Sequence, residues 1–137
     1  MSLVYTEITL KNTIDVANAA SGEVKGHKIR KTTVRALVDS GAWTLVIDEK
    51  TRKKLGLNIF KTSSGTLADG KRTEYSMAGP VEVNWKNRST NCDAIVLPKA
   101  DDTLLGAIPL EAMDLMVCPR TEQVVGVHGD QVVHTIK

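Results

Sequence analysis

The sequence has 137 residues and a formal net charge of +2, with 42% hydrophobic and 25% charged residues. This length and composition are ordinary for one soluble globular domain, so we expect a single domain over residues 1–137. The small charge and the scattered basic residues argue against a nucleic-acid partner. No apolar stretch approaches the ~18 residues of a membrane span and no secretory leader is expected, so we predict a cytoplasmic protein without a membrane partner.

The first third of the sequence predicts three short strands. Aromatic residues are only 4% of the chain, so the core is aliphatic and rich in β-branched residues, which favour strands. Residues 4–10 alternate weakly in polarity, residues 32–38 are rich in Thr and Val, and residues 43–47 are apolar. Between the first two, residues 12–28 contain Ala-Ala-Ser-Gly and a later glycine, which predict a loop or a loose hairpin.

A short helix is predicted over residues 49–55. Asp48 before it is a good N-cap, Glu49 lies in the first turn, and Gly56 just past the end suits a C-terminal cap. The last turn carries basic residues that match the helix dipole and are expected to face solvent, namely Arg52, Lys53 and Lys54.

Turn signals recur between short apolar runs in the rest of the chain. Asp69-Gly70 is a strong hairpin signal, and residues 81–85 and 90–97 predict two strands joined near Asn87. Pro109 starts a short helix that ends near Met113. Further strands are expected over residues 115–118, 124–127 and 132–136. This pattern predicts an all-β, barrel-like or sandwich fold with one or two short helices.

One motif carries chemistry: Ala36-Leu37-Val38-Asp39-Ser40-Gly41-Ala42 joins an apolar run to an acid, a hydroxyl and a glycine. The run would deliver the Asp39 carboxylate from a buried strand into a tight turn, and Gly41 lets another chain approach closely. Attack of water on a peptide bond by carboxylates needs two acids that face one another. The sequence holds no second Asp-Ser/Thr-Gly, so this chemistry requires the chain to pair with itself. The alternative is that Asp39 is an ordinary turn acid.

Three further features follow this motif along the chain. The first is the Asp69-Gly70 hairpin, the second is Ile95-Val96-Leu97, and the third is Leu104-Leu105-Gly106, which comes directly before the short helix. In this order the chain resembles the retropepsin-like aspartic proteases over roughly residues 30 to 120, most closely the small prokaryotic members with a single Asp-Ser-Gly. The resemblance implies a closed, barrel-like monomer that becomes an aspartic endopeptidase only as a symmetric homodimer. It also implies a protein or peptide substrate and no cofactor.

The same resemblance assigns roles to individual residues. Asp39 corresponds to the catalytic aspartate, Ser40 to the hydroxyl that locks the two catalytic loops together, and Gly41 to the glycine that lets the loops meet. A flap over the substrate is implied for residues 67–73, with substrate contacts from Ala42, Leu67, Ala68, Asp69 and Gly70. Structural support behind the Asp39 loop is implied for Leu105 and Gly106.

The implied mechanism rests on two carboxylates about 3 Å apart, which cannot both stay ionised. They share one proton, so one carboxylate activates water as a base while the other donates to the scissile carbonyl. This predicts activity at acid to near-neutral pH, which fades as the shared proton is lost.

Two positions depart from the retroviral pattern, in which an acid and an arginine pair to brace the dimer. In this chain Trp43 or Thr44 stands where the acid would be, and Ala107 and Ile108 stand where the arginine would be. Apolar contact would therefore have to replace that ion pair. A catalytically inactive dimerisation or protein-binding module therefore stands as the alternative function.

The histidines and cysteines suggest no further site. His27, His128 and His134 lack the spacing of metal ligands, and no metal site is expected. Cys92 and Cys118 are expected to be small buried residues rather than a disulfide.

Overall fold

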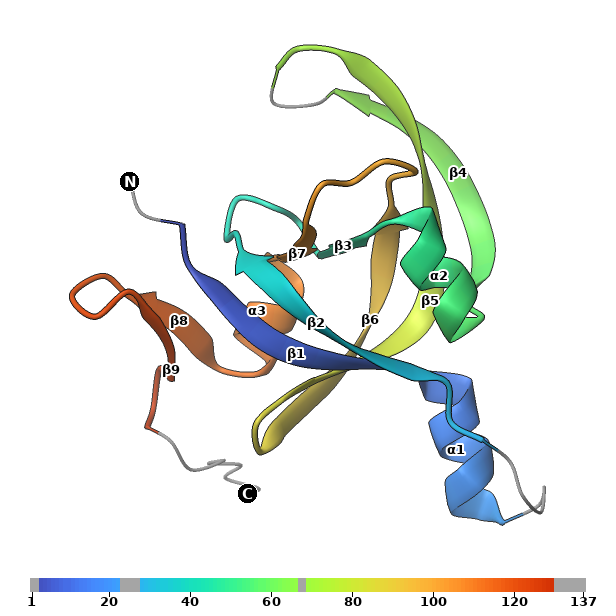
Figure 1. Ribbon diagram of the computed structural model, residues 1–137, viewed down its shortest axis with the longest axis horizontal. Helices are drawn as coiled ribbons and strands as arrows, with labels where there is room; N and C mark the ends of the chain where they lie inside the picture. Colours follow the sequence, from blue (N-terminus) through green and yellow to red (C-terminus); the bar gives the residue numbers. More distant parts are fainter. Residues whose placement is uncertain (1–2, 23–27, 67–68, 130–137) are drawn as a thin grey trace.

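The computed structural model describes residues 3–22, 28–66 and 69–129 (Figure 1). Strands dominate this part of the chain, with the bounds Tyr5–Asn12 (β1), Lys31–Val38 (β2), Leu45–Ile47 (β3), Asn58–Thr66 (β4), Arg72–Trp85 (β5), Arg88–Val96 (β6), Thr103–Leu105 (β7), Leu115–Cys118 (β8) and Gln123–Gly126 (β9). The helices described are Thr13–Ser21 (α1), Glu49–Leu55 (α2) and Ala107–Ala112 (α3). The predicted all-β class is confirmed, although one helix more than expected is present.

Six of the strands close into a barrel. Hydrogen-bonded neighbours follow the order β1-β2-β7-β3-β6-β5, and β5 returns to β1 where residues 81–84 lie opposite residues 9–12. The pairs β2–β7 and β3–β6 are parallel, and the other pairs in the ring are antiparallel. Because the ring closes on itself, its strands satisfy one another's backbone groups without an open edge.

The barrel interior is aliphatic, as the composition predicted. Along β1, Ile8 and Leu10 are buried while Thr9 and Lys11 between and after them face outward, the period-two pattern of a half-buried strand. Other fully buried side chains in the same core are Leu45, Ile47, Leu55, Leu57, Val81, Val83, Val96 and Leu105. Burial of this apolar surface is the main force that holds the barrel together.

A long hairpin of β4 and β5 projects beyond the barrel. β4 pairs with the first half of β5, from Asn58 opposite Gly79 to Thr66 opposite Arg72. Figure 1 shows this hairpin arching over the end of the barrel where the turn between β2 and β3 lies. β4 itself was not predicted, because its side chains are mostly exposed on both faces and alternate only between half-buried and exposed over its last four residues.

The loop or loose hairpin predicted for residues 12–28 is wrong over its first half, which forms α1. The side chain of Asn12 accepts a hydrogen bond from the Asp15 N–H (3.0 Å) and caps the helix, and Gly22 ends it at φ 69°. The Ala-Ala-Ser-Gly stretch is therefore the last turn and the C-terminal cap of a helix. The remainder of the predicted loop, residues 23–27, lies outside the described residues.

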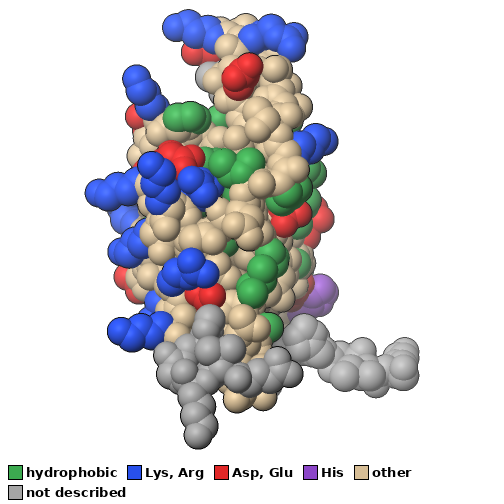
Figure 2. All heavy atoms as spheres, turned by 90° about the vertical axis from the view of Figure 1, so that its right-hand side faces the viewer, with side chains coloured by type: hydrophobic (Ala, Val, Ile, Leu, Met, Phe, Trp, Pro, Cys, Tyr) green, Lys and Arg blue, Asp and Glu red, His purple; other side chains and the backbone are tan. Residues whose placement is uncertain are grey.

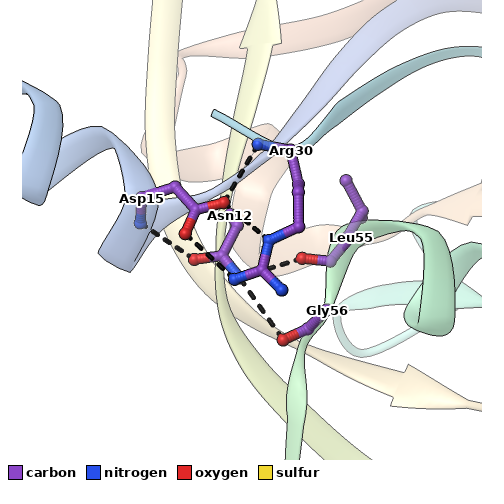
Figure 3. Close-up of polar contacts among 5 residues, drawn as sticks. All are labelled: Asn12, Asp15, Arg30, Leu55 and Gly56. Carbon is purple, nitrogen blue, oxygen red and sulfur yellow. Dashed lines mark hydrogen bonds and ion pairs between the residues drawn. The ribbon is translucent and has the colours of Figure 1, made fainter. Parts of the chain in front are cut away.

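A buried polar cluster connects α1 to α2 (Figure 3). The Asp15 side chain is only 2% exposed and accepts hydrogen bonds from the backbone N–H (3.0 Å), Nε (2.8 Å) and Nη2 (3.0 Å) of Arg30. Asn12 Nδ2 donates to the carbonyls of Leu55 (2.9 Å) and Gly56 (3.4 Å). Because a buried carboxylate without partners is costly, these contacts fix the connection from β1 to β2 against the end of α2.

α2 forms over the predicted residues with the predicted caps. Asp48 Oδ1 accepts from the Thr51 N–H (2.7 Å), and Gly56 has φ 65°. The side-chain hydrogen bond from Thr51 lowers the pKa of Asp48. Lys53 and Lys54 are exposed, as expected, but Arg52 is not a purely solvated residue, because its Nη1 donates to the Leu57 carbonyl (2.9 Å).

The second half of the chain largely follows the predicted elements. The β5–β6 hairpin turns between Trp85 and Arg88, and the α3 helix, β8 and β9 lie within two residues of their predicted bounds. The predicted strand 43–47 is shorter, since β3 begins at Leu45. The strand predicted over residues 132–136 falls outside the described residues.

Arg88 anchors the C-terminal hairpin β8–β9 to the barrel. This buried side chain donates from Nη1 to the carbonyls of Met113 (2.9 Å) and Asp114 (3.0 Å), and from Nη2 to the carbonyl of Gly129. Asp114 Oδ1 also lies 2.8 Å from the ring Nδ1 of His128, a largely exposed side chain. One arginine at the start of β6 thus joins three points of the chain that follows α3.

Candidate active site

The turn after β2 holds Asp39 at the end of the barrel under the hairpin. The Asp39 N–H donates to the carbonyl of Leu105 (3.0 Å), and the Ala42 N–H donates to the Asp39 carbonyl (3.0 Å). The carboxylate oxygen Oδ1 accepts from the Gly41 N–H (2.9 Å), which is the side-chain-to-backbone turn that Asp favours. The Asp39 side chain is half-buried, and Gly41 is its hydrogen-bond partner among the described residues. One carboxylate oxygen is therefore left available at the surface.

β7 and the residues after it lie directly against this turn. Val38 and Leu105 are register partners in the parallel pair β2–β7. A Cβ placed on Gly106 would lie 2.2 Å from the Thr44 carbonyl oxygen and 2.7 Å from that of Ala42, so the close approach requires glycine. The structure thus places Leu105 and Gly106 behind the Asp39 turn, where the sequence analysis expected them; their supporting role stays a prediction.

The other residues of the motif occupy the same turn. Ser40 is exposed, and within the described part of the chain its hydroxyl makes no hydrogen bond. A Cβ on Gly41 would lie 3.1 Å from Asp39 Oδ1, which is tight. Ala42 is half-buried, and its carbonyl accepts from the Ala107 N–H (2.8 Å). An exposed Ser40 hydroxyl is free to reach a second chain, as its predicted locking role requires.

The predicted substrate-binding residues of the hairpin are only partly within the described structure. Asp69 and Gly70 form its tip, where Asp69 Oδ1 accepts from the Lys71 N–H (2.9 Å) and Gly70 has φ 87°. The predicted hairpin is therefore confirmed, and its tip is exposed. Leu67 and Ala68 lie outside the described residues. Contact of any of these residues with a substrate stays a prediction.

Trp43 and Ile108 expose apolar surface beside the Asp39 turn. Their side chains are 59% and 40% exposed, and the Ile108 N–H donates to the Trp43 carbonyl (3.1 Å). Together they line a hollow of about 250 Å³, whose other walls are Thr44, Met77, Asn91, Cys92 and Asp93. The two positions that lack the retroviral bracing pair therefore lie next to each other and both expose apolar side chains.

The wall of this hollow contains two residues, Thr44 and Cys92, to which the sequence assigned no role in the site. Thr44 is buried, and its Oγ1 donates to the Asp93 carbonyl (3.0 Å), which ties the end of the turn to β6. Cys92 is half-buried and free, and burial raises the pKa of its thiol to about 11. It is thus a neutral packing residue at physiological pH. The sequence signal was the position of Thr44, two residues after the motif.

A second hollow was not anticipated from the sequence either. It encloses about 270 Å³ and is lined by Thr73 of the hairpin and by Leu97, Pro98 and Lys99, which follow β6. It therefore lies between the projecting hairpin and the connection to β7. Pro98 is the one sequence feature that points to this region, because a proline at the end of an apolar strand indicates that a loop begins there.

The described residues, which omit 1–2, 23–27, 67–68 and 130–137, contain no group of three or more His, Cys, Asp or Glu side chains arranged to hold a metal ion. None of the helices in that part of the chain has the length and apolar character needed to cross a membrane.

Comparison with known proteins identifies the family. A family model described as aspartyl protease matches residues 18–108, which include β2, the Asp39 turn, the hairpin and β7. Among solved structures, EIAV protease complexed with the inhibitor HBY-793 matches with a TM-score of 0.53 at 18% identity, over 80% of this chain and 86% of that one. A search of curated proteins gives no match. The Asp39 turn, the closed barrel and the family match agree: the chain belongs to the aspartyl protease family, and its fold is similar to that of a retroviral protease.

Proposed function

We propose that two copies of this chain form a homodimer in which the two Asp39 carboxylates activate one water molecule for hydrolysis of a peptide bond. The observation that carries this proposal is the single Asp-Ser-Gly turn of each chain, held at the barrel surface with one carboxylate oxygen unengaged. Retropepsin chemistry needs two facing carboxylates, and one chain supplies one. The site is therefore complete only when a second copy faces the first.

The mechanism follows from the charge of such a pair. Two carboxylates about 3 Å apart hold one proton between them, because two negative charges at that distance repel strongly away from bulk water. The ionised member takes a proton from water as the water attacks the carbonyl carbon, and the protonated member donates to the carbonyl oxygen. Collapse of the resulting diol breaks the C–N bond: the protonated carboxyl gives its proton to the leaving amine nitrogen, and the ionised carboxylate takes a proton from a diol hydroxyl, so the pair again holds one proton. The hairpin of β4 and β5 would close over the substrate during these steps.

Trp43 and Ile108 support a subunit contact next to this site. Both side chains are exposed although apolar, and the hydrogen bond from the Ile108 N–H to the Trp43 carbonyl holds the start of α3 against the end of the turn that carries Asp39. Burial of such a pair against its symmetric copy would stabilise the dimer through apolar contact, at roughly 25 cal/mol per Å². This contact takes the place of the absent Asp–Arg brace. A Trp43→Glu substitution is expected to weaken the dimer, as measured by sedimentation equilibrium, whereas Trp43→Phe should leave it nearly intact.

The decisive experiment measures cleavage of a denatured protein substrate between about pH 4 and 7, with and without a pepstatin-type inhibitor. Asp39→Asn is expected to lower kcat by about a thousandfold, the contribution of acid–base catalysis. Asp101→Asn, at another exposed turn acid, is the matched control and should retain wild-type cleavage. If Asp39→Asn retains activity, the proposed mechanism is wrong.

Mixing experiments test the shared site. Titration of wild-type protein with excess Asp39→Asn protein would convert active homodimers into heterodimers that carry one carboxylate. Specific activity should then fall below the value for simple dilution. Unchanged activity at large excess would show that one chain suffices. A dimer with no cleavage in any condition would instead support the alternative, an inactive dimerisation or protein-binding module.

A further inference from the structure

We infer that a concave basic surface far from Asp39 binds an extended acidic segment of another protein. The surface encloses about 650 Å³ and brings together Lys11 of β1, Lys31 of β2, Lys54 of α2 and Lys86 of the β5–β6 turn. Its remaining lining is polar and uncharged: Thr9, Thr32, Thr33 and Asn84. We call these eight residues the lysine groove. This inference does not rest on the proposed catalytic function.

The lysines meet because of the strand register. Lys11 and Lys31 lie directly opposite each other in the antiparallel pair β1–β2. Like charges in opposite positions of a sheet repel and destabilise it. Glu82 on β5 is the other cross-strand neighbour of Lys11, but it does not line the groove. Glu82 offsets part of the repulsion on Lys11, whereas Lys31 faces only a like charge in this pair. An acidic group bound between the two lysines would relieve what remains, so the pair suits a role in binding.

The charges of the groove are largely uncompensated. Over residues 3–22, 28–66 and 69–129, no ion pair involves any of its four lysines. Lys86 lies 4.7 Å from the centroid of the Trp85 ring, which orients its ammonium group without neutralising it. On the face seen in Figure 2, Lys and Arg side chains are most frequent along the left-hand side, with a few Asp and Glu side chains among them, while hydrophobic side chains occupy the middle. The chain, with a net charge of only +2, therefore concentrates positive charge locally.

The lining favours a peptide carboxylate over a nucleic acid. Single-stranded nucleic acids bind through exposed aromatic rings or arginine planes that stack on the bases, and the groove has neither. The one ring beside it, Trp85, is buried. The hydroxyls of Thr9 and Thr33 hydrogen-bond to each other (2.9 Å), and the Asn84 amide donates to the Thr9 carbonyl (3.4 Å). Each of these groups can make a further hydrogen bond, so together with the ammonium groups they suit the backbone and carboxylates of an extended acidic segment.

The groove is separate from the proposed active site. Lys31 begins β2 and Asp39 follows its end, so the eight positions between them correspond to roughly 26 Å of extended chain. A partner that occupies the groove leaves the Asp39 turn free.

Fluorescence anisotropy with a fluorescein-labelled octaglutamate peptide tests this inference at about 0.05 M salt, where exposed charges are weakly screened. The groove variant replaces Lys11, Lys31 and Lys54 by Gln. The control variant replaces Lys61, Lys71 and Lys99 by Gln; these are exposed elsewhere, so both variants carry the same net charge. We expect the groove variant to bind about eightfold more weakly, since each exposed ion pair contributes a factor of roughly two, and the control variant to stay within about twofold of the wild type.

Absence of binding, or equal weakening in both variants, would overturn the inference, because attraction would then depend on net charge alone. Tighter binding of an octathymidylate oligonucleotide through the same lysines would overturn the assignment to a peptide. ¹⁵N chemical shifts of the wild-type protein supply a readout that needs no variant: octaglutamate should shift the amides of Thr9, Thr33 and Asn84. Shifts confined to other residues would also refute the groove.

Discussion

Gly106→Ala tests whether close backbone contact between β7 and the Asp39 turn holds the site together. Gly106 has φ −90°, which alanine adopts without strain. In an open position such a substitution would stabilise the protein by about 0.4–1 kcal/mol, because it restricts the unfolded chain. Here the added Cβ would lie 2.2 Å from the Thr44 carbonyl oxygen and 2.7 Å from that of Ala42. Steric and entropic effects therefore predict opposite signs.

The steric effect should dominate, since the obstructing atoms are backbone atoms that cannot rotate away. Overpacking of this kind costs about 1–3 kcal/mol. Separation of the two segments would also weaken the hydrogen bonds from the Ala107 N–H to Ala42 and from the Ile108 N–H to Trp43, at about 1 kcal/mol each. We expect a loss of about 3–5 kcal/mol in the free energy of unfolding, a large part of the 5–15 kcal/mol typical of a domain.

Urea unfolding followed by circular dichroism measures this loss. With an m-value of about 2 kcal/mol/M, the midpoint should fall by roughly 2 M. Gly22→Ala is the control: Gly22 has φ 69° but open space around its Cβ position, so it should lose only about 1 kcal/mol from backbone strain. A Gly106→Ala protein as stable as this control, or more stable than the wild type, would refute the steric argument.

Three further predictions concern separate parts of the fold. The pKa of Asp48 is lower in the folded protein than in the unfolded chain, so its contribution to stability is complete above the unfolded pKa and is lost as the pH falls through the folded pKa. In urea unfolding at acid pH, the free energy of unfolding of Asp48→Asn should therefore depend less on pH than that of the wild type. Iodoacetamide at pH 8 should alkylate Cys118, whose pKa is lowered by the hydrogen bond to Thr121, much faster than Cys92, whose pKa is about 11. Arg88→Met should cost about 2–4 kcal/mol, because three carbonyls lose a buried donor, and hydrogen exchange should show loss of protection in β8 and β9 before the barrel.

Each of these predictions has an opposing result. An unchanged acid dependence in Asp48→Asn would show that the Thr51 contact does not hold the carboxylate ionised. Equal alkylation rates at the two cysteines would contradict the burial of Cys92. Uniform loss of protection across the barrel in Arg88→Met would show that this arginine stabilises the whole fold and not only the C-terminal hairpin.

The Asp39 turn was predictable because its signals are local. An apolar strand, an acid and a glycine in sequence determine a turn whose hydrogen bonds run between Asp39, Gly41 and Ala42. The caps of α2 are local in the same sense, since Asp48 and Gly56 lie one residue from its ends. Elements determined by neighbouring residues were therefore placed to within one or two positions.

The features that were missed depend on distant contacts or on conflicting local signals. Alanine, serine and glycine favour both a loop and a helix end, and α1 is decided by the capping side chain of Asn12 and the burial of Asp15 against Arg30. β4 has no buried face of its own and exists because β5 pairs with it. The hollow beside Trp43 is lined by residues of the turn, of β5, of β6 and of α3, and no local sequence pattern predicts that these residues lie together.

β5 belongs both to the projecting hairpin and to the barrel. Residues 72–75 pair with β4 alone among the described strands, whereas residues 81–84 pair with both β1 and β6. Pro80, between these two stretches, has no N–H to contribute to either ladder. The outer arm can therefore open without breaking the hydrogen bonds of the barrel, and its amide protons should exchange at a free energy well below that of global unfolding. A single strand thus connects an arm that can open locally to a barrel that is hydrogen-bonded on both sides.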